Sequence, residues 1–448
     1  MSENPGEQPE NPFKGTPFEQ IFGAFGGVGG PGAGGMPDLS ALMSQMQSMM
    51  APHDGAVNWK LAGDLARQAV AKEPDPSPSQ REQDAVADAV RLADHWLDEA
   101  CEFPSGVTST AAWSRAEWIE STRAVWQVLV EPVAEHVVAA MGKALPEEAR
   151  AMAGPLIGML GQMGGAMFGS QVGTALGGLA GEVLTASDIG LPLGPAGRAA
   201  LVPTNVAKFA EGLDITSDDV RLYLALREAA HQRLFAHVPW LREHLISAVA
   251  DYGRGITIDT AGIEEQMRNL NPGDPTAIQE AMEGGLFEPK QTPAQQAALL
   301  RLETTLALVE GWVDDVVGQA ANERMPAATR LQEAVRRRRA AGGPAEETFA
   351  ALVGLELRPR RLRDASTLWG SLRTRHGNDG RDSVWLHPDL LPSADDLDDP
   401  LGFREETAES VSLSDEDFDA ELAKLLDDSQ GEGKGDNTGG DSPDSPDA

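Results

Sequence analysis

Arg227-Glu228-Ala229-Ala230-His231 lies in the middle of a segment whose pattern predicts one long helix. Thr216 is a typical N-cap residue before two acidic residues, and Pro239 closes the segment, which leaves a helix of roughly twenty residues. Apolar side chains recur at steps of three and four residues, and Arg227 and His231 occupy two places in that stripe. A buried guanidinium without a partner would cost several kcal/mol. The sequence therefore predicts that an acceptor lies against this face.

A second predicted helix offers that acceptor. Glu310 stands in the middle of its inward stripe, among Leu302, Leu306, Val313 and Val317. Two neighbouring helices that carry polar groups on their apolar faces can satisfy each other's hydrogen bonds. We therefore expect the two helices to be adjacent and Arg227 to form an ion pair with Glu310. A plainer alternative is that Arg227 lies at the surface and His231 is an ordinary core histidine.

Residues 227–231 differ by one letter from His-Glu-x-x-His, a helical motif in which two histidines bind zinc and the glutamate polarises a metal-bound water. Glu228 and His231 occupy the second and fifth places of this motif, and Arg227 occupies the place of the first ligand. Arginine has no acceptor atom and keeps its proton, so it cannot bind a cation. Three matching letters alone do not define a metal site.

Longer stretches of the chain resemble bacterial zincin-like proteins, a family of zinc-dependent metalloproteases and hydrolases, some associated with deazaflavin-coenzyme biosynthesis genes. The similar stretches are residues 171–173, 188–193, 226–235, 306–317 and 352–357, within a region from about residue 60 to residue 392. In zincins of this type a glutamate on a later helix completes the metal site. The resemblance therefore implies zinc as cofactor, with His231 and Glu310 as ligands and Glu228 as the general base.

Arg227 argues against that metal. A catalytic zinc normally has three protein ligands, so this site is one short. A fixed positive charge roughly 4 Å from a divalent ion adds on the order of 8 kcal/mol of repulsion at an effective dielectric near 20. We expect the Arg227–Glu310 ion pair to replace zinc, which predicts a weakly active or non-catalytic zincin that acts as a binding or scaffold protein. Asp314, one turn after Glu310, either orients a ligand as a second-shell residue or is a surface acid.

Two other function classes stay open. The chain could be an active metallopeptidase that recruits a different third ligand, with Glu228 as its base. It could also be a membrane-associated assembly built on the segment from Ala151 to Gly181, which has no charged residue and a glycine at every fourth position from Gly161. A four-residue step overshoots the helical turn by about 40°, so we expect the glycines to wind around a helix buried by several neighbours. Glutamines and a proline in this segment make membrane insertion the less favoured alternative.

Composition limits the partners. A net charge of −34 argues against general binding to nucleic acid or anionic membranes. A degenerate zincin that keeps its old substrate cleft implies a peptide or protein as its partner. The local exception is a basic patch made of Arg336–Arg339 together with Arg358, Arg360, Arg361 and Arg363. We interpret it as a basic helix end that is stabilised by its own C-terminal carbonyls and stops at Gly342, with binding of the acidic tail to the patch as the alternative. A single cysteine and the lack of a signal-like N-terminus predict a cytoplasmic location.

The chain divides by composition into three parts. Residues 1–55 are rich in Gly, Pro and Met and are predicted to be disordered. Residues 56–392 are predicted to form one mostly α domain with few strands, of which 255–258 and 383–386 are the best candidates. Residues 393–448 are acidic and are predicted to be a disordered tail with a short amphipathic helix over Asp417–Asp428.

Overall fold

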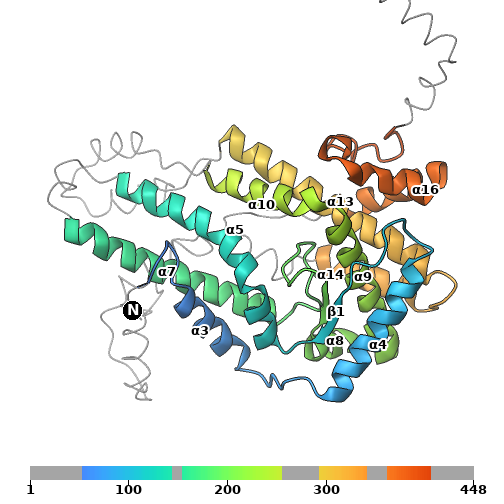
Figure 1. Ribbon diagram of the computed structural model, residues 1–448, viewed down its shortest axis with the longest axis horizontal. Coiled ribbons are helices and arrows are strands. Elements are labelled where there is room, and N and C mark those ends of the chain that lie inside the picture. The colour runs from blue at the N-terminus through green and yellow to red at the C-terminus, as the bar shows by residue number, and fades with distance from the viewer. Residues whose placement is uncertain (1–52, 144–153, 255–291, 341–360, 405–448) are drawn as a thin grey trace, which may run out of the picture. The chain divides into compact units, whose positions relative to one another are not determined.

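The computed structural model describes residues 53–143, 154–254, 292–340 and 361–404 (Figure 1). The described chain is mostly helical, which confirms the expected fold class. Residues 1–52, the strand expected at 255–258 and the amphipathic helix expected at 417–428 lie outside the described residues. The elements in chain order are α3 (Trp59–Val70), α4 (Gln80–Leu97), β1 (Ser109–Ala112), α5 (Arg115–Lys143), α7 (Gly154–Ala180), β2 (Arg198–Leu201), α8 (Pro203–Ala210), α9 (Ser217–His237), α10 (Pro239–Arg254), α13 (Pro293–Ala321), α14 (Ala328–Ala340), α16 (Leu362–Asp382) and the 3-10 turns η2 (Ser383–Leu386) and η3 (Pro388–Leu390).

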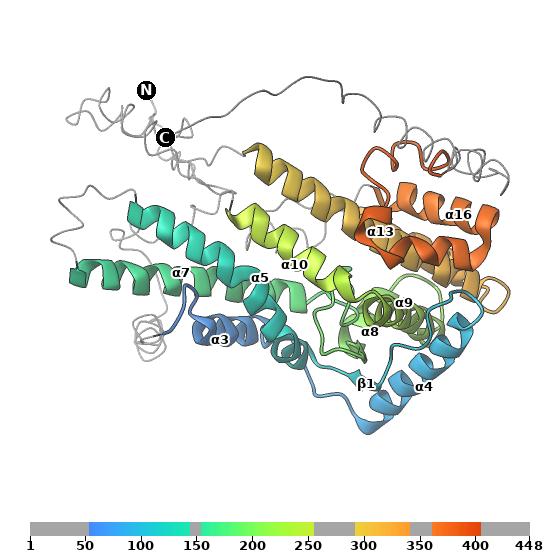
Figure 2. The same ribbon diagram turned by 45° about the horizontal axis from the view of Figure 1, so that its top comes forward.

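Helices α9 and α13 form the centre of the core. Thr216 caps α9 by accepting a hydrogen bond from the Asp219 amide at 3.1 Å, and the next helix begins at Pro239, as the sequence predicts. Every residue of α9 from Tyr223 to Leu234 is buried, and α13 is buried on all sides over residues 307–317. The two helices are in contact, and α4, α10 and β2 also pack against α9 (Figure 2). Polar residues in the middle of either helix therefore depend on protein partners rather than on water.

A two-stranded parallel sheet lies beside α9. Strand β1 pairs with β2 in the register Ser109 to Arg198, and Thr185 adds an antiparallel bridge to β2. The Gln83 side chain bonds to both the amide and the carbonyl of Ala112, at 2.8 and 2.7 Å. The Gln83 side chain makes the hydrogen bonds that a further strand would make there, so the amide and carbonyl of Ala112 are not free to pair with another strand.

The strand predicted at residues 383–386 is wrong, because these residues form the 3-10 turn η2. Val384 and Trp385 are buried there, and burial rather than strand pairing explains their apolar character. The Trp385 ring stacks on Trp369 of α16, with 5.3 Å between the ring centroids. A short apolar run fits a buried turn as well as a strand.

The glycine-rich helix α7 lies against α3 (Figure 2). A Cβ atom on Gly169 would be 2.5 Å from the Asn58 carbonyl oxygen, and one on Gly173 would be 2.6 Å from that of Ala62. Gly165, Gly169, Gly173 and Gly177 thus all face α3 and the residues just before it, and the expectation that the glycines wind around the helix is wrong for these four. Residues four apart form a row that is inclined by about 26° to the helix axis. A neighbouring helix that crosses α7 at an angle can therefore contact the whole row of glycines, as α3 does. None of the described helices is long and apolar enough to span a membrane.

The compact unit that holds these elements extends to Pro400, past residue 392, where the acidic segment begins. Leu397 is 1% exposed, and Arg361 donates a hydrogen bond to the Ala394 carbonyl and forms an ion pair with Asp398. The first residues of the acidic segment therefore pack onto the helical unit.

Candidate functional site

Arg227 and His231 lie one turn apart on α9, and their side chains are only 5% and 2% exposed. The Nδ1 atom of His231 is 2.8 Å from the Arg227 carbonyl oxygen, and its Nε2 atom is 3.0 Å from Oε1 of Glu310. Both ring nitrogens therefore face an oxygen of the protein, and the nitrogen that faces the Glu310 carboxylate is the one that donates to it.

Glu310 on α13 is the hub of the site. Its Oε2 atom accepts from Nη2 of Arg227 at 2.5 Å, and its Oε1 atom accepts from His231 at 3.0 Å and from Nη2 of Arg339 at 2.9 Å. Burial by itself would raise the pKa of Glu310, but the positive charges of Arg339, His231 and Arg227 outweigh it and lower the pKa to about 2. Glu310 is therefore a carboxylate, and both its oxygens are occupied by protein donors.

The basic run at the end of α14 supplies partners that the sequence analysis missed. Arg339 bonds to Glu310 and to the carbonyl of Asp188, and Arg338 bonds to Oδ2 of Asp188 at 2.9 Å. Arg336 pairs with Asp314, whereas Arg337 points outward. The interpretation of this run as a helix end stabilised by its own carbonyls is therefore wrong for three of its four arginines, whose partners lie on other segments. Positions 336 and 339 are three apart and share a helix face, which was the available signal.

Asp188 belongs to the turn that carries the chain past Glu310. It accepts from the Leu184 amide at 3.0 Å, and although burial raises its pKa, Arg338 and Arg339 lower it below the ordinary value. Gly190 follows with a φ of +77°, and a Cβ atom there would lie 3.0 Å from Oε1 of Glu310. Both the backbone conformation and the close approach to Glu310 favour glycine at this position.

Asp314 lies behind Arg227 and is 1% exposed, so it is not a surface acid. It forms an ion pair with Arg336 and accepts from Gln332 at 3.0 Å and from Ser366 at 2.9 Å. Its other oxygen is 3.8 Å from Nη1 of Arg227. Asp314 therefore pairs with two arginines of the site, Arg227 and Arg336.

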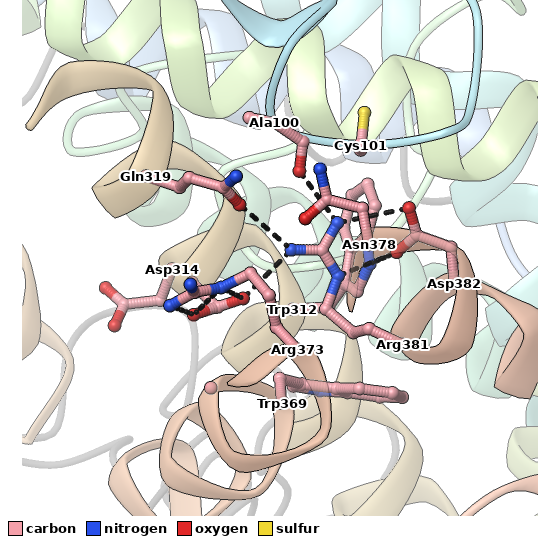
Figure 3. A network of polar contacts seen from close by, with 12 residues as sticks. Ala100, Cys101, Trp312, Asp314, Gln319, Trp369, Arg373, Asn378, Arg381 and Asp382 are labelled. Carbon is pink, nitrogen blue, oxygen red and sulfur yellow. Dashed lines mark hydrogen bonds and ion pairs between the residues drawn. The ribbon is translucent and has the colours of Figure 1, made fainter. Parts of the chain in front are cut away.

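The next residue, Asp315, belongs to a separate buried network (Figure 3). Arg381, which is completely buried, donates to Asp315 at 2.9 Å, to its neighbour Asp382 at 2.7 Å and to the Ala100 carbonyl at 2.8 Å. Its guanidinium lies 5.7 Å from the centre of the Trp312 ring. In Figure 3 the Asp314 carboxylate points away from this network. Of these two neighbouring residues of α13, Asp314 pairs with arginines of the candidate site, and Asp315 pairs with Arg381 of α16.

Glu228 occupies a separate buried position and is 0% exposed. Its Oε2 atom accepts from the Ser187 amide at 3.0 Å, and its Oε1 atom accepts from Nε2 of Gln232 at 2.9 Å. Burial raises the pKa of Glu228, and the charge of His231 and the hydrogen bonds offset this only in part. A general base needs an oxygen that reaches a substrate or water, whereas both oxygens here are bound by the protein itself.

These residues do not fit a zinc ion. The structure brings His231 and Glu310 together, but the ring nitrogen that faces Glu310 donates to it, and Arg227 and Arg339 hold the same carboxylate. A divalent ion at Glu310 would have to displace two guanidinium groups and then bear their repulsion. Among the residues that the structure describes, no group of three or more His, Cys, Asp and Glu side chains is arranged to hold a metal.

Residues 57–403 match the family of Zincin-like metallopeptidases. The match covers well over half of the chain, so this chain belongs to that family, as the resemblance of its motifs implied. A crystal structure described as "a putative hydrolase with a novel fold", from Chloroflexus aurantiacus, is similar, with a TM-score of 0.57 and 20% sequence identity. The similarity covers 79% of this chain and 99% of that one, and at such low identity it shows a shared fold only. No curated protein matches the sequence.

Proposed function

We propose that this chain is a non-catalytic zincin in which buried arginines replace the metal, and that it acts as a binding or scaffold protein for a peptide or protein segment. The observation that carries the proposal is the coordination of Glu310. Its two oxygens accept from Arg227, His231 and Arg339 at 2.5 to 3.0 Å in a site that is nearly closed to water. Two guanidinium groups and an imidazole thus occupy the carboxylate that the family pattern would assign to zinc.

The arginines are suited to replace an ion. A guanidinium is permanently charged and presents a planar fork of donors, so it can bridge acceptors that a metal would otherwise hold. Arg227 spans Glu310 and Asp314, and Arg339 spans Glu310 and the Asp188 carbonyl. The centre therefore ties α9, α13, α14 and the turn at residue 188 together without a metal.

Glu228 supports the same proposal. Its hydrogen bonds to Ser187 and Gln232 leave it in a structural role, in which it connects α9 to the segment after α7. A carboxylate whose two oxygens both accept from protein donors is not placed to take a proton from a water molecule. The alternative, an active metallopeptidase that recruits another ligand, requires Glu228 and His231 to leave these partners.

Metal analysis of untagged protein purified without chelators tests the proposal. We expect zinc far below one equivalent per chain, with no difference between the wild type and His231→Ala. Near-stoichiometric zinc in the wild type that disappears in His231→Ala would overturn the proposal. Hydrolysis of a broad peptide library by the wild type, abolished by Glu228→Gln, would establish the enzyme in its place.

Restoration of the missing ligand gives a second test. Because Arg339 also holds Glu310, Arg227→His alone should recover little zinc binding. The double variant Arg227→His/Arg339→Leu should bind zinc more tightly by at least about tenfold. Arg227→His/Arg337→Leu is the matched control, since Arg337 is exposed and pairs with Glu333 outside the site. Equal zinc affinity in the two double variants would show that Arg339 does not block the metal position.

A further inference from the structure

The end of α14 and the start of α16 form a basic surface on this acidic chain. Glu333 of α14 pairs with Arg337 at 3.0 Å and with Arg363 of α16 at 3.5 Å, so the two helix ends are neighbours. Arg358 and Arg360, which precede α16 in the sequence, lie outside the described residues. We use the name basic surface for the partly exposed arginines of these two ends: Arg336, Arg337, Arg338, Arg361 and Arg363.

The charge that the basic surface presents to solvent is mainly positive. Arg337 and Arg363 are 76% and 69% exposed, and they share one carboxylate, that of Glu333, which is 36% exposed. Asp188 and Asp314, the acids that pair with two of the less exposed arginines, are only 9% and 1% exposed. A ligand that approaches Arg337 and Arg363 therefore meets two guanidinium groups and one accessible carboxylate.

Arg361 indicates the chemistry of the ligand. It donates a hydrogen bond to the Ala394 carbonyl and forms an ion pair with Asp398, and both residues belong to the acidic segment that begins at residue 393. Within the described residues, no acid of that segment pairs with Arg337 or Arg363. One arginine of the basic surface thus already holds part of an acidic segment, while the two most exposed ones do not.

From this arrangement we infer that the basic surface binds an acidic protein segment, rich in Asp and Glu, through Arg337 and Arg363. The inference rests on the proposed binding function, for which it names a surface and a ligand. A guanidinium group presents two parallel N–H donors that match the two oxygens of a carboxylate. Because the two arginines come from helix ends that are in contact through Glu333, one short segment can reach both.

The total charge of −34 does not prevent this binding. At physiological ionic strength, the interaction between exposed charges is largely screened beyond about 8 Å. A short peptide on the basic surface therefore interacts mainly with the adjacent arginines. A nucleic acid carries one charge for about every 1.7 Å of duplex and extends beyond the surface, so it also meets the acids that dominate the rest of the chain.

The binding test uses the full chain and two fluorescent octapeptides, one of alternating Asp and Glu and one of alternating Asn and Gln. Fluorescence anisotropy measures both affinities at low and at physiological salt. We expect the acidic peptide to bind, and its affinity to fall as salt is added, because exposed ion pairs are screened. Equal binding of the two peptides would overturn the inference, and so would tighter binding of a DNA oligonucleotide of the same net charge.

The acidic segment can come from the tail of this chain or from another protein. Replacement of Asp415, Glu416, Asp417 and Asp419 by the matching amides in the full chain separates these two sources. A tail that occupies the surface competes with the peptide, so this variant should then bind the peptide more tightly than the wild type. Unchanged affinity assigns the surface to a segment of another protein. Binding of the acidic peptide by neither protein would contradict the inference.

Arg337→Gln/Arg363→Gln removes the two most exposed charges of the surface. Each exposed ion pair corresponds to at most about a fivefold change in affinity, so the double variant should bind the acidic peptide about tenfold more weakly. The matched control is Arg91→Gln/Arg254→Gln, which replaces two arginines on α4 and α10 that are 76% and 58% exposed and pair with an acid of their own helix. Equal losses in the two double variants would refute the inference, because binding would then follow the total charge.

Zinc analysis of the same preparations shows which proposal has failed. Zinc-free protein that does not bind the acidic peptide contradicts only the inference about the ligand. Zinc-loaded protein that hydrolyses peptides contradicts the proposed function, whatever it binds at the basic surface.

Discussion

Replacement of Arg227 by methionine measures what the arginine centre contributes to stability. The substitution keeps most of the side-chain volume but removes the donor that lies 2.5 Å from Glu310. Removal of one partner from a buried ion pair costs about 3 to 5 kcal/mol. Because Glu310 keeps His231 and Arg339 as donors, we expect a cost near the lower limit, about 3 kcal/mol. With an unfolding entropy of about 2.1 cal/mol/K per residue over roughly 350 residues, this lowers the melting temperature by about 4 °C.

Thermal unfolding followed by circular dichroism provides the assay. The matched control is Arg337→Met, because Arg337 is 76% exposed and pairs with Glu333 on the same helix. Water screens an exposed pair of this kind, so the control should shift the melting temperature by less than about 1 °C. Equal shifts in the two variants would refute the reasoning, because the buried position of Arg227 would then have no energetic consequence.

Two further predictions follow from the structure. Because the pKa of Glu310 is lowered to about 2 in the folded protein, its contribution to stability is complete above about pH 4.5 and is lost as the pH falls toward 2. Urea unfolding should therefore show the stability difference between the wild type and Glu310→Gln shrinking by about 3 kcal/mol over that range, and a constant difference would contradict it. Gly173→Ala, whose Cβ would lie 2.6 Å from the Ala62 carbonyl oxygen, should destabilise the protein by about 1 to 3 kcal/mol. Gly178→Ala meets no atom within 4 Å and should stabilise it by up to about 1 kcal/mol, so equal melting temperatures would contradict the assigned α3–α7 contact.

Periodicity in the sequence was enough to locate the two central helices. The stripe that contains Arg227 and His231, and the later stripe that contains Glu310, both coincide with helices that are buried and in contact. The structure brings Arg227 and Glu310 within hydrogen-bond distance. The reason is general: a polar residue in an apolar stripe must find a partner, and few polar residues occupy such stripes.

Contacts between distant segments could not be read in the same way. Arg339 looked like one more charge in a basic run, because helical spacing gives the face of a residue but not which helix packs against that face. The strand expected at 383–386 failed for a related reason, since burial selects apolar residues in turns as well as in strands. The sequence assigns Glu228 to a motif, but its hydrogen bond from the Ser187 amide depends on how the segment after α7 packs against α9.

The sequence by itself determined the helical class, the boundaries of α9 and the absence of an imidazole at position 227, because local spacing and side-chain chemistry need no partner to be recognised. Only the tertiary structure decided which charges meet at Glu310. Three helices and one turn converge there, and the distances that set an ion pair's energy arise when they pack.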